Sequence, residues 1–355
     1  MAELDKIFKA GFNYKASDIH VVPDEPFIIR RLGTLIKTKI PTLTPKQCEK
    51  AILEILTPEQ MKILKTELQL DFSYALKGIG RLRGSAMMHH RGLSATFRLI
   101  PEKIPSLLDL GLPAKSIKVL DNHQGLVLIT GATGQGKTTT LAAMVDHINS
   151  TRAHHILTIE DPVEFVHPIK KGVVNQRELG KDTLSYHNSL KAALREDPDV
   201  IMIGELRDLE TMSLAISAAE TGHLVLGTLS TTNAPKTIDR IIDSFPPGEQ
   251  GQIRATLSET LKAVITQKLI QDISGKSMVL AVEVLIGSLP VASMIRDSKV
   301  FQIPNLMQTG KNLGMCLMDE SIAELVQDGK ISVAEASKYI GNEQILSEIS
   351  KLQES

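Results

Sequence analysis

A glycine-rich segment near the middle of the chain has the residue types and spacing of a phosphate-binding loop. The run from 131 to 138 matches the pattern G-x-x-x-x-G-K-S/T, between an apolar stretch and a helix-forming one. Backbone N–H groups of such a loop, and the helix that follows, attract phosphate oxygens. We expect Lys137 to reach the β- and γ-phosphates of ATP and the Thr138 hydroxyl to ligate Mg²⁺. The expected nucleotide-binding residues are Gly131, Ala132, Thr133, Gly134, Gln135, Gly136, Lys137, Thr138 and Thr139.

An apolar run that ends in an acid supplies the carboxylate that such a loop needs. Residues 199–205 read Asp-Val-Ile-Met-Ile-Gly-Glu, a Walker B pattern with Glu205 at its carboxyl end. Ligands of open α/β sheets bind at the carboxyl ends of the strands. We therefore predict that Glu205 is catalytic and polarises the attacking water.

A second acidic cluster follows a predicted strand at 155–159. Glu160, Asp161 and Glu164 lie within five residues, and such crowding is unfavourable unless a cation neutralises it. The predicted metal ligands are Thr138, Glu160 and Asp161, and Glu164 is a second candidate for a catalytic carboxylate. The alternative is a solvated acidic loop without a ligand.

The order of elements around these motifs predicts the fold class. Apolar strands alternate with helices, which indicates a parallel sheet with helices on its faces. Beyond residue 250 we expect mainly helices, with terminal ones at 332–339 and 343–352. The expected strands are 125–130, 155–159, 199–203 and 223–228, and the expected helices are 137–150, 183–195 and 209–220.

The first hundred residues have a different pattern, that of a small α+β domain. Short strand-like runs surround a helical stretch at 44–68, which Thr44 and Pro45 open. Two prolines at 101–105 indicate a stiff linker. We predict an N-terminal domain at 1–100, a linker at 101–115 and a core with a helical tail at 116–355. The expected N-terminal strands are 18–22, 26–31, 70–75, 80–89 and 94–100.

Composition narrows the classes of function. The net charge is −1 and aromatic residues make up 3% of the chain, which disfavours a nucleic-acid-dependent motor. Two cysteines, Cys48 and Cys316, cannot form a four-cysteine zinc module or a disulfide framework. No apolar run reaches about 20 residues, the length of a membrane span. We expect a cytoplasmic protein without nucleic-acid partners.

The ordered motifs resemble those of the hexameric secretion ATPases, and within them the type IV pilus retraction (twitching motility, PilT-like) ATPases. The resemblance covers nearly the whole chain. Besides the glycine-rich loop, its markers are the runs 16–20, 158–165, 194–199, 205–208, 219–223 and 308–310.

The resemblance implies a fold, an assembly and further site residues. It implies a PAS-like N-terminal domain, a RecA-like ATPase core, a homohexameric ring and an inner-membrane pilus platform protein as partner, at the cytoplasmic face of that membrane. It also implies that Arg81, Arg83 and Arg98 reach nucleotide held between subunits, where a guanidinium group binds phosphate oxygens well. His223 belongs to its histidine motif and is a further catalytic candidate. The lack of a zinc module favours retraction over extension.

Two departures keep other functions open. Ser230 stands where the family has a second histidine, so the expected contact with the γ-phosphate loses charge and reach. The run 289–297 keeps one arginine, Arg296, where retraction enzymes carry two. The alternatives are a pilus-extension or type II secretion ATPase, a retraction-accessory paralogue and a nucleic-acid-dependent RecA-like motor. A non-hydrolysing scaffold would be expected to lack Lys137 or Glu205, and both are present.

Overall fold

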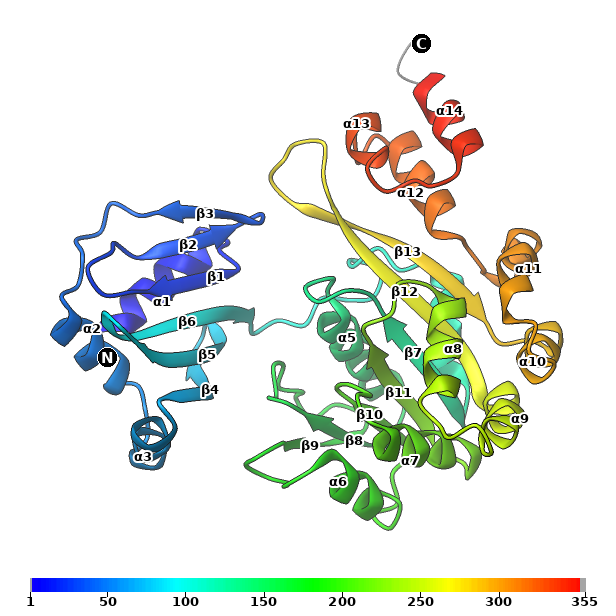
Figure 1. Ribbon diagram of the computed structural model, residues 1–355, viewed down its shortest axis with the longest axis horizontal. Coiled ribbons are helices and arrows are strands. Elements are labelled where there is room, and N and C mark those ends of the chain that lie inside the picture. The colour runs from blue at the N-terminus through cyan, green and yellow to red at the C-terminus, as the bar shows by residue number, and fades with distance from the viewer. Residues whose placement is uncertain (1, 352–355) are drawn as a thin grey trace. The chain divides into compact units, whose positions relative to one another are not determined.

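The chain folds into two compact units. The structure is a computed structural model that describes residues 2–351. Unit 1 contains the residues up to Ile104 together with the short segment 162–166, and unit 2 contains the rest. The expected class, a small α+β domain followed by an α/β core, is confirmed (Figure 1). The exact limits of the linker stay a prediction.

Unit 1 is built on an antiparallel sheet. Its six strands have the order β3-β2-β1-β6-β5-β4, and Phe8, Ile52 and Phe97 are fully buried in its core. The expected stretch at 44–68 is two helices, because Thr57 caps a new helix and Pro58 cannot donate to the first one. The elements are α1 Glu3–Asn13, β1 Asp18–Val21, β2 Ile28–Arg31, β3 Thr34–Lys37, α2 Pro45–Leu53, α3 Pro58–Glu67, β4 Gln69–Leu76, β5 Gly80–His89 and β6 Gly92–Pro101.

Unit 2 is built on a mostly parallel sheet. Its seven strands have the order β13-β12-β7-β11-β10-β8-β9, and the β12–β13 pair alone is antiparallel. Every residue of β7 and β11 is buried, as expected for strands covered on both faces. The elements up to residue 243 are α4 Ala114–Ile117, η1 Lys118–Asp121, β7 Gly125–Thr130, α5 Lys137–Thr151, β8 His155–Glu160, β9 Val173–Glu178, α6 Tyr186–Ala193, β10 Val200–Ile203, α7 Leu209–Glu220, β11 Leu224–Leu229 and α8 Ala234–Asp243.

The chain beyond residue 250 is mainly helical, as expected, but the sequence prediction missed two strands in it. Strands β12 and β13 form a long hairpin there, and β12 pairs with β7 next to the glycine-rich loop. The strand residues are rich in Val, Ile and Leu, and the Asp272 carboxylate accepts hydrogen bonds that close the turn. The remaining elements are α9 Gln250–Thr260, β12 Leu261–Gln271, β13 Met278–Ile286, α10 Leu289–Arg296, η2 Val300–Gln302, α11 Ile303–Thr309, η3 Gly310–Leu313, α12 Met318–Gln327, α13 Val333–Ala336 and α14 Glu343–Lys351.

The C-terminal helices are joined to the sheet through a buried carboxyl group. Glu283 on β13 is 7% exposed, and its Oε1 accepts a hydrogen bond of 2.7 Å from the N–H of Ala234, which begins α8. The N–H of Met318, which begins α12, donates to the same carboxyl group. Burial raises the Glu283 pKa, and these two backbone hydrogen bonds oppose the rise. One side chain therefore anchors the first turns of two helices.

The terminal helices partly match expectation. The predicted helix at 332–339 is the short α13, and the one at 343–352 is α14, for which residue 352 lies outside the described residues. None of the helices within residues 2–351 has both the length and the apolar character that a membrane crossing requires.

Candidate functional site

The glycine-rich loop joins β7 to α5, in the strand–loop–helix context that its motif requires. Gly131 has a φ of +138°, and a Cβ there would lie 2.6 Å from the backbone oxygen of Gln267 on β12. Gly136 precedes the helix at a φ of +80°. Both backbone conformations favour glycine. The loop can therefore pass close to β12 and present its N–H groups at the start of α5.

Lys137 begins α5 and folds back over the loop. Its Nζ donates hydrogen bonds to the backbone oxygens of Gly131 at 2.8 Å and Ala132 at 3.0 Å. Burial lowers the Lys137 pKa, and the negative charge of Glu205 opposes that shift. Neutral carbonyl acceptors bind an ammonium group less strongly than phosphate does, so a phosphate group can displace them. Lys137 is positioned for that exchange.

Two glutamines fix the loop and its helix to β12. The Oε1 of Gln135 accepts a hydrogen bond of 2.6 Å from the N–H of Leu269. The Nε2 of the buried Gln267 donates to the Thr140 hydroxyl at 2.7 Å. Strand β12 continues beyond the end of β7, and Gln135 takes the position of a strand partner there. The sequence prediction missed Gln267 because it did not anticipate a strand at this position.

Glu205 lies two residues after β10, at the carboxyl end of the sheet. Its Oε2 accepts a hydrogen bond of 2.6 Å from the Arg207 Nε, and its Oε1 accepts one of 3.3 Å from the Ser230 hydroxyl. The family resemblance implied a γ-phosphate contact by a histidine at this position, which serine was expected to weaken, and the structure shows Ser230 bonded to Glu205. Both oxygens of the predicted catalytic carboxylate are thus oriented by neighbouring side chains. No part of the sequence prediction assigned Arg207 a role.

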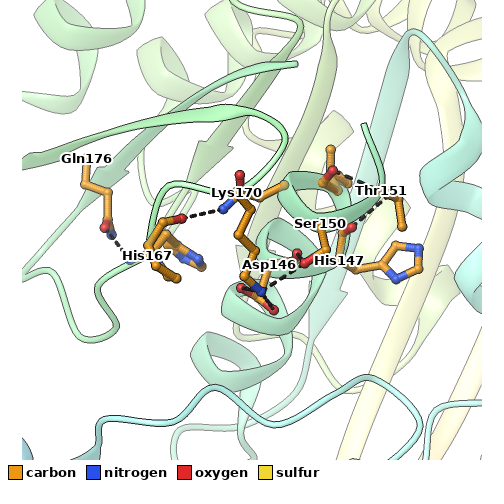
Figure 2. Close-up of polar contacts among 10 residues, drawn as sticks. Asp146, His147, Ser150, Thr151, His167, Lys170 and Gln176 are labelled. Atoms are coloured by element: carbon orange, nitrogen blue, oxygen red, sulfur yellow. Dashed lines mark hydrogen bonds and ion pairs between the residues drawn. The ribbon is translucent and has the colours of Figure 1, made fainter. Parts of the chain in front are cut away.

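Glu160, a predicted metal ligand, lies buried at the end of β8. Its Oε1 accepts hydrogen bonds from the Thr158 hydroxyl at 2.7 Å and from the Gln176 Nε2 at 2.9 Å. The Oε1 of Gln176 accepts from the backbone N–H of His167 at 2.9 Å (Figure 2). Glu160 therefore connects β8 to β9 and to the segment that follows the acidic cluster.

That segment is also tied to the helix of the glycine-rich loop. Figure 2 shows Lys170 reaching Asp146 and Ser150 on α5, with Nζ–O distances of 2.7 Å to Asp146 Oδ1 and 2.9 Å to the Ser150 hydroxyl. Desolvation lowers the pKa of the buried His167 to about 4, so its imidazole is neutral near pH 7. The contacts of Lys170 hold the segment 167–170, which follows the acidic cluster, in a fixed place relative to α5.

The predicted ligands could hold Mg²⁺ only if a nucleotide supplied further oxygen ligands. Thr138 is in the first turn of α5, and Asp161 is exposed directly after β8. Within residues 2–351, no group of three or more His, Cys, Asp or Glu side chains could hold a metal ion. Mg²⁺ commonly keeps several waters and takes phosphate oxygens as ligands, so one hydroxyl and a nearby carboxylate are compatible with it.

The three predicted arginines lie in unit 1 on neighbouring strands. Arg81 and Arg83 alternate with buried residues of β5 and so share one face, and Arg83 is directly opposite Arg98 of β6. The Nε of Arg98 pairs with the Asp18 Oδ1 at 3.2 Å. The Nη1 of Arg81 donates to the backbone oxygen of Val163 at 3.1 Å.

Glu164 joins the same group of arginines. Burial raises its pKa, and the positive charges of Arg83 and Arg98 oppose that rise. Because residues 162–166 belong to unit 1, the structure places this carboxylate with the arginines on the sheet of that unit. The sequence treated Glu164 as part of the acidic cluster and contained no signal for this arrangement.

His223 lies at the other end of the core sheet from the glycine-rich loop. It precedes β11, its backbone oxygen accepts from the Gly125 N–H at 3.0 Å, and its Nδ1 is 3.0 Å from the Ala218 oxygen. Gly125 begins β7, and the loop follows the last residue of that strand. Six strand residues span about 20 Å. Within one chain, His223 is therefore apart from Lys137 and Glu205.

These features define a class of protein. A parallel sheet, a glycine-rich loop that leads into a helix, and an acid at the end of a neighbouring strand together make a P-loop nucleotide-binding core. The sequence profile of the family described as type II/IV secretion system protein matches residues 1–345, and the chain belongs to this family.

Within this family, the chain is similar to proteins of pilus retraction and twitching motility. The chain is 48% identical over 317 residues to the type IV pilus retractation ATPase PilT of Pseudomonas aeruginosa, covering 89% of this chain and 92% of that protein. It is 46% identical over 320 residues to a twitching motility protein of Neisseria gonorrhoeae, covering 90% and 86%. The crystal structure of the pilus retraction motor PilT with bound ADP superposes with a TM-score of 0.88 at 41% identity, covering 98% and 99%. The predicted resemblance to pilus retraction ATPases is confirmed.

Proposed function

We propose that this protein is an ATPase that powers the retraction of type IV pili. The observation that carries the proposal is the joint placement of Lys137 and Glu205 at one end of the core sheet, in a chain similar along almost its whole length to pilus retraction ATPases. The loop supplies hydrogen-bond donors that can bind phosphate, and the Glu205 carboxylate can accept a proton from the attacking water.

Each part of the site has a distinct task in this proposal. The loop N–H groups and Lys137 hold the phosphates, which requires Lys137 to leave the backbone oxygens of Gly131 and Ala132. Thr138 and Asp161 would hold Mg²⁺, which would neutralise phosphate charge when bound. Glu205, oriented by Arg207 and Ser230, accepts a proton from the attacking water.

The proposal includes an assembly and a location. Arg81, Arg83 and Arg98 serve nucleotide at the contact between two subunits of a homohexameric ring. The ring acts in the cytoplasm, against an inner-membrane platform protein of the pilus. Support comes from the exposed guanidinium of Arg98, which pairs with a single carboxylate and keeps donors for a phosphate.

The test combines motility with enzymology. Pilus retraction should be lost in a strain that lacks this protein and be restored by the wild-type chain but not by Lys137→Ala. Purified Lys137→Ala should fold and lose ATP turnover, whereas the control Lys191→Ala, at an exposed lysine of α6, should keep both activities. Full turnover in Lys137→Ala would overturn the nucleotide site. Turnover without any effect on retraction would instead indicate an extension or accessory motor.

A further inference from the structure

Tyr186 places a hydroxyl group beside Gly204, the residue that precedes Glu205. It is the first residue of α6, a helix whose start is fixed by the Ser185 hydroxyl, which accepts a hydrogen bond of 3.0 Å from the Asn188 N–H. Its ring packs against the core of unit 2. A Cβ built on Gly204 would lie 3.3 Å from the Tyr186 hydroxyl oxygen, so the hydroxyl reaches the residue that precedes Glu205.

The backbone at this point is held on both sides. The N–H of Gly204 donates to the Ile159 oxygen at 2.8 Å, and its own oxygen accepts from the Thr228 hydroxyl at 2.6 Å. Ile159 and Thr228 belong to β8 and β11, the two strands that flank β10. The position of the Tyr186 hydroxyl next to Gly204 is therefore fixed by the sheet and by the capped start of α6.

The surroundings keep this hydroxyl protonated. Burial is the largest cause that raises the Tyr186 pKa above its ordinary value, followed by the negative charge of Asp161, with smaller contributions from Glu205 and Glu160. Arg207 opposes them. Its place next to Gly204 puts the hydroxyl at the carboxyl end of β10, on the side of β8, where a neutral phenol is a hydrogen-bond donor.

We propose that the Tyr186 hydroxyl is a further donor of the nucleotide site, directed at the water that Glu205 polarises. This rests on the proposed ATPase function. The Glu205 carboxylate takes one proton from the water while the water oxygen bonds to the γ-phosphorus and the bond from that phosphorus to the β,γ-bridging oxygen breaks. Tyr186 keeps its proton throughout and orients the water through one of the oxygen lone pairs.

If Tyr186 had only a structural role, its ring would be sufficient for that role and its hydroxyl would not be needed. The ring packs against apolar side chains of the core, which phenylalanine would contact equally well. The two roles therefore differ in one atom. Tyr186→Phe removes that atom and leaves the packing in place.

The experiment is the steady-state ATPase of assembled Tyr186→Phe with saturating Mg²⁺. We expect kcat to fall about 10-fold, the scale of one lost hydrogen bond in the reaction's transition state, with KM and the affinity for ADP within about 2-fold of wild type. The control Tyr339→Phe removes a hydroxyl from the C-terminal helical region, 3.4 Å from the Glu335 carboxylate, and should leave kcat unchanged.

The outcomes separate this inference from the function on which it rests. An unchanged kcat in Tyr186→Phe, with Lys137→Ala inactive, overturns the role of Tyr186 and leaves the ATPase intact. A Tyr186→Phe variant that loses ADP affinity and thermal stability together also overturns it, because the hydroxyl is then structural. A wild-type protein without ATP turnover overturns both.

Discussion

The predicted groups of the core and those of unit 1 are positioned in different ways. In the core, Lys137 follows β7 and Glu205 follows β10, so both lie at the carboxyl edge once these strands join one parallel sheet. In unit 1, Arg83 and Arg98 lie within long strands, and Glu164 comes from a segment far along the chain. Local motifs together with the rule for parallel sheets predict the first arrangement, whereas no local pattern predicts the second.

The two regions also differ in what a phosphate must displace. Lys137 is bonded to neutral backbone oxygens, which compete weakly for its charge. Arg98 pairs with Asp18, and the charges of Arg83 and Arg98 both act on Glu164. Recruiting these arginines to a nucleotide requires competition with carboxylates of the same chain. The core is thus prepared for its ligand, whereas in unit 1 neighbouring carboxylates compete with a phosphate for the arginines.

The largest expected effect tests the core. Glu205→Gln keeps the shape of the side chain but cannot accept the proton, so ATP turnover should fall about 100-fold or more while ADP binding persists. Turnover and ADP affinity are measured on the same preparation, with Glu220→Gln, at the exposed end of α7, as the matched control. Equal loss of ADP binding would make Glu205 a residue that holds the ligand or the loop.

A smaller effect tests unit 1. Arg83→Ala should lower the turnover of assembled protein by about 10-fold or more, the scale of a lost charge-assisted hydrogen bond, and Glu164→Gln should change it less. Mixing Arg83→Ala subunits with Lys137→Ala subunits should restore part of the activity, since some subunit contacts then pair an intact arginine with an intact loop. A mixture that stays inactive, or a fully active Arg83→Ala, contradicts shared sites.

The smallest effect concerns Ser230, where the chain leaves its family. Its hydrogen bond to Glu205 is long and solvent-exposed, so Ser230→Ala should lower kcat only about 3-fold, whereas Ser230→Thr, which keeps the hydroxyl, should retain it. A gain in rate in Ser230→His would instead support the phosphate contact that the family resemblance implied. Steady-state rates of the three variants, at pH values on both sides of the histidine pKa of about 6.5, distinguish the two roles.

Particular residues show how far sequence reasoning reached. The expected strands at 80–89 and 125–130 coincide with β5 and β7, and the helix at 209–220 coincides with α7, because turn residues and apolar runs mark their ends. The hairpin of β12 and β13 was missed, and with it the contact of Gln135 with Leu269. The sequence also contained no sign of which residues surround Glu164, because no local pattern specifies which distant side chains come together in the fold.

Glu283 has a consequence for chimaeric motors. After an exchange of the C-terminal helices at a junction between β13 and α12, another chain would supply the backbone donor of residue 318, and a graft that misplaced this donor would cost about 1 to 3 kcal/mol. The disturbance would extend to α8, whose first residue is bonded to the same side chain and follows Ser230 by only four positions. A functional graft should therefore transfer β13 together with the C-terminal helices.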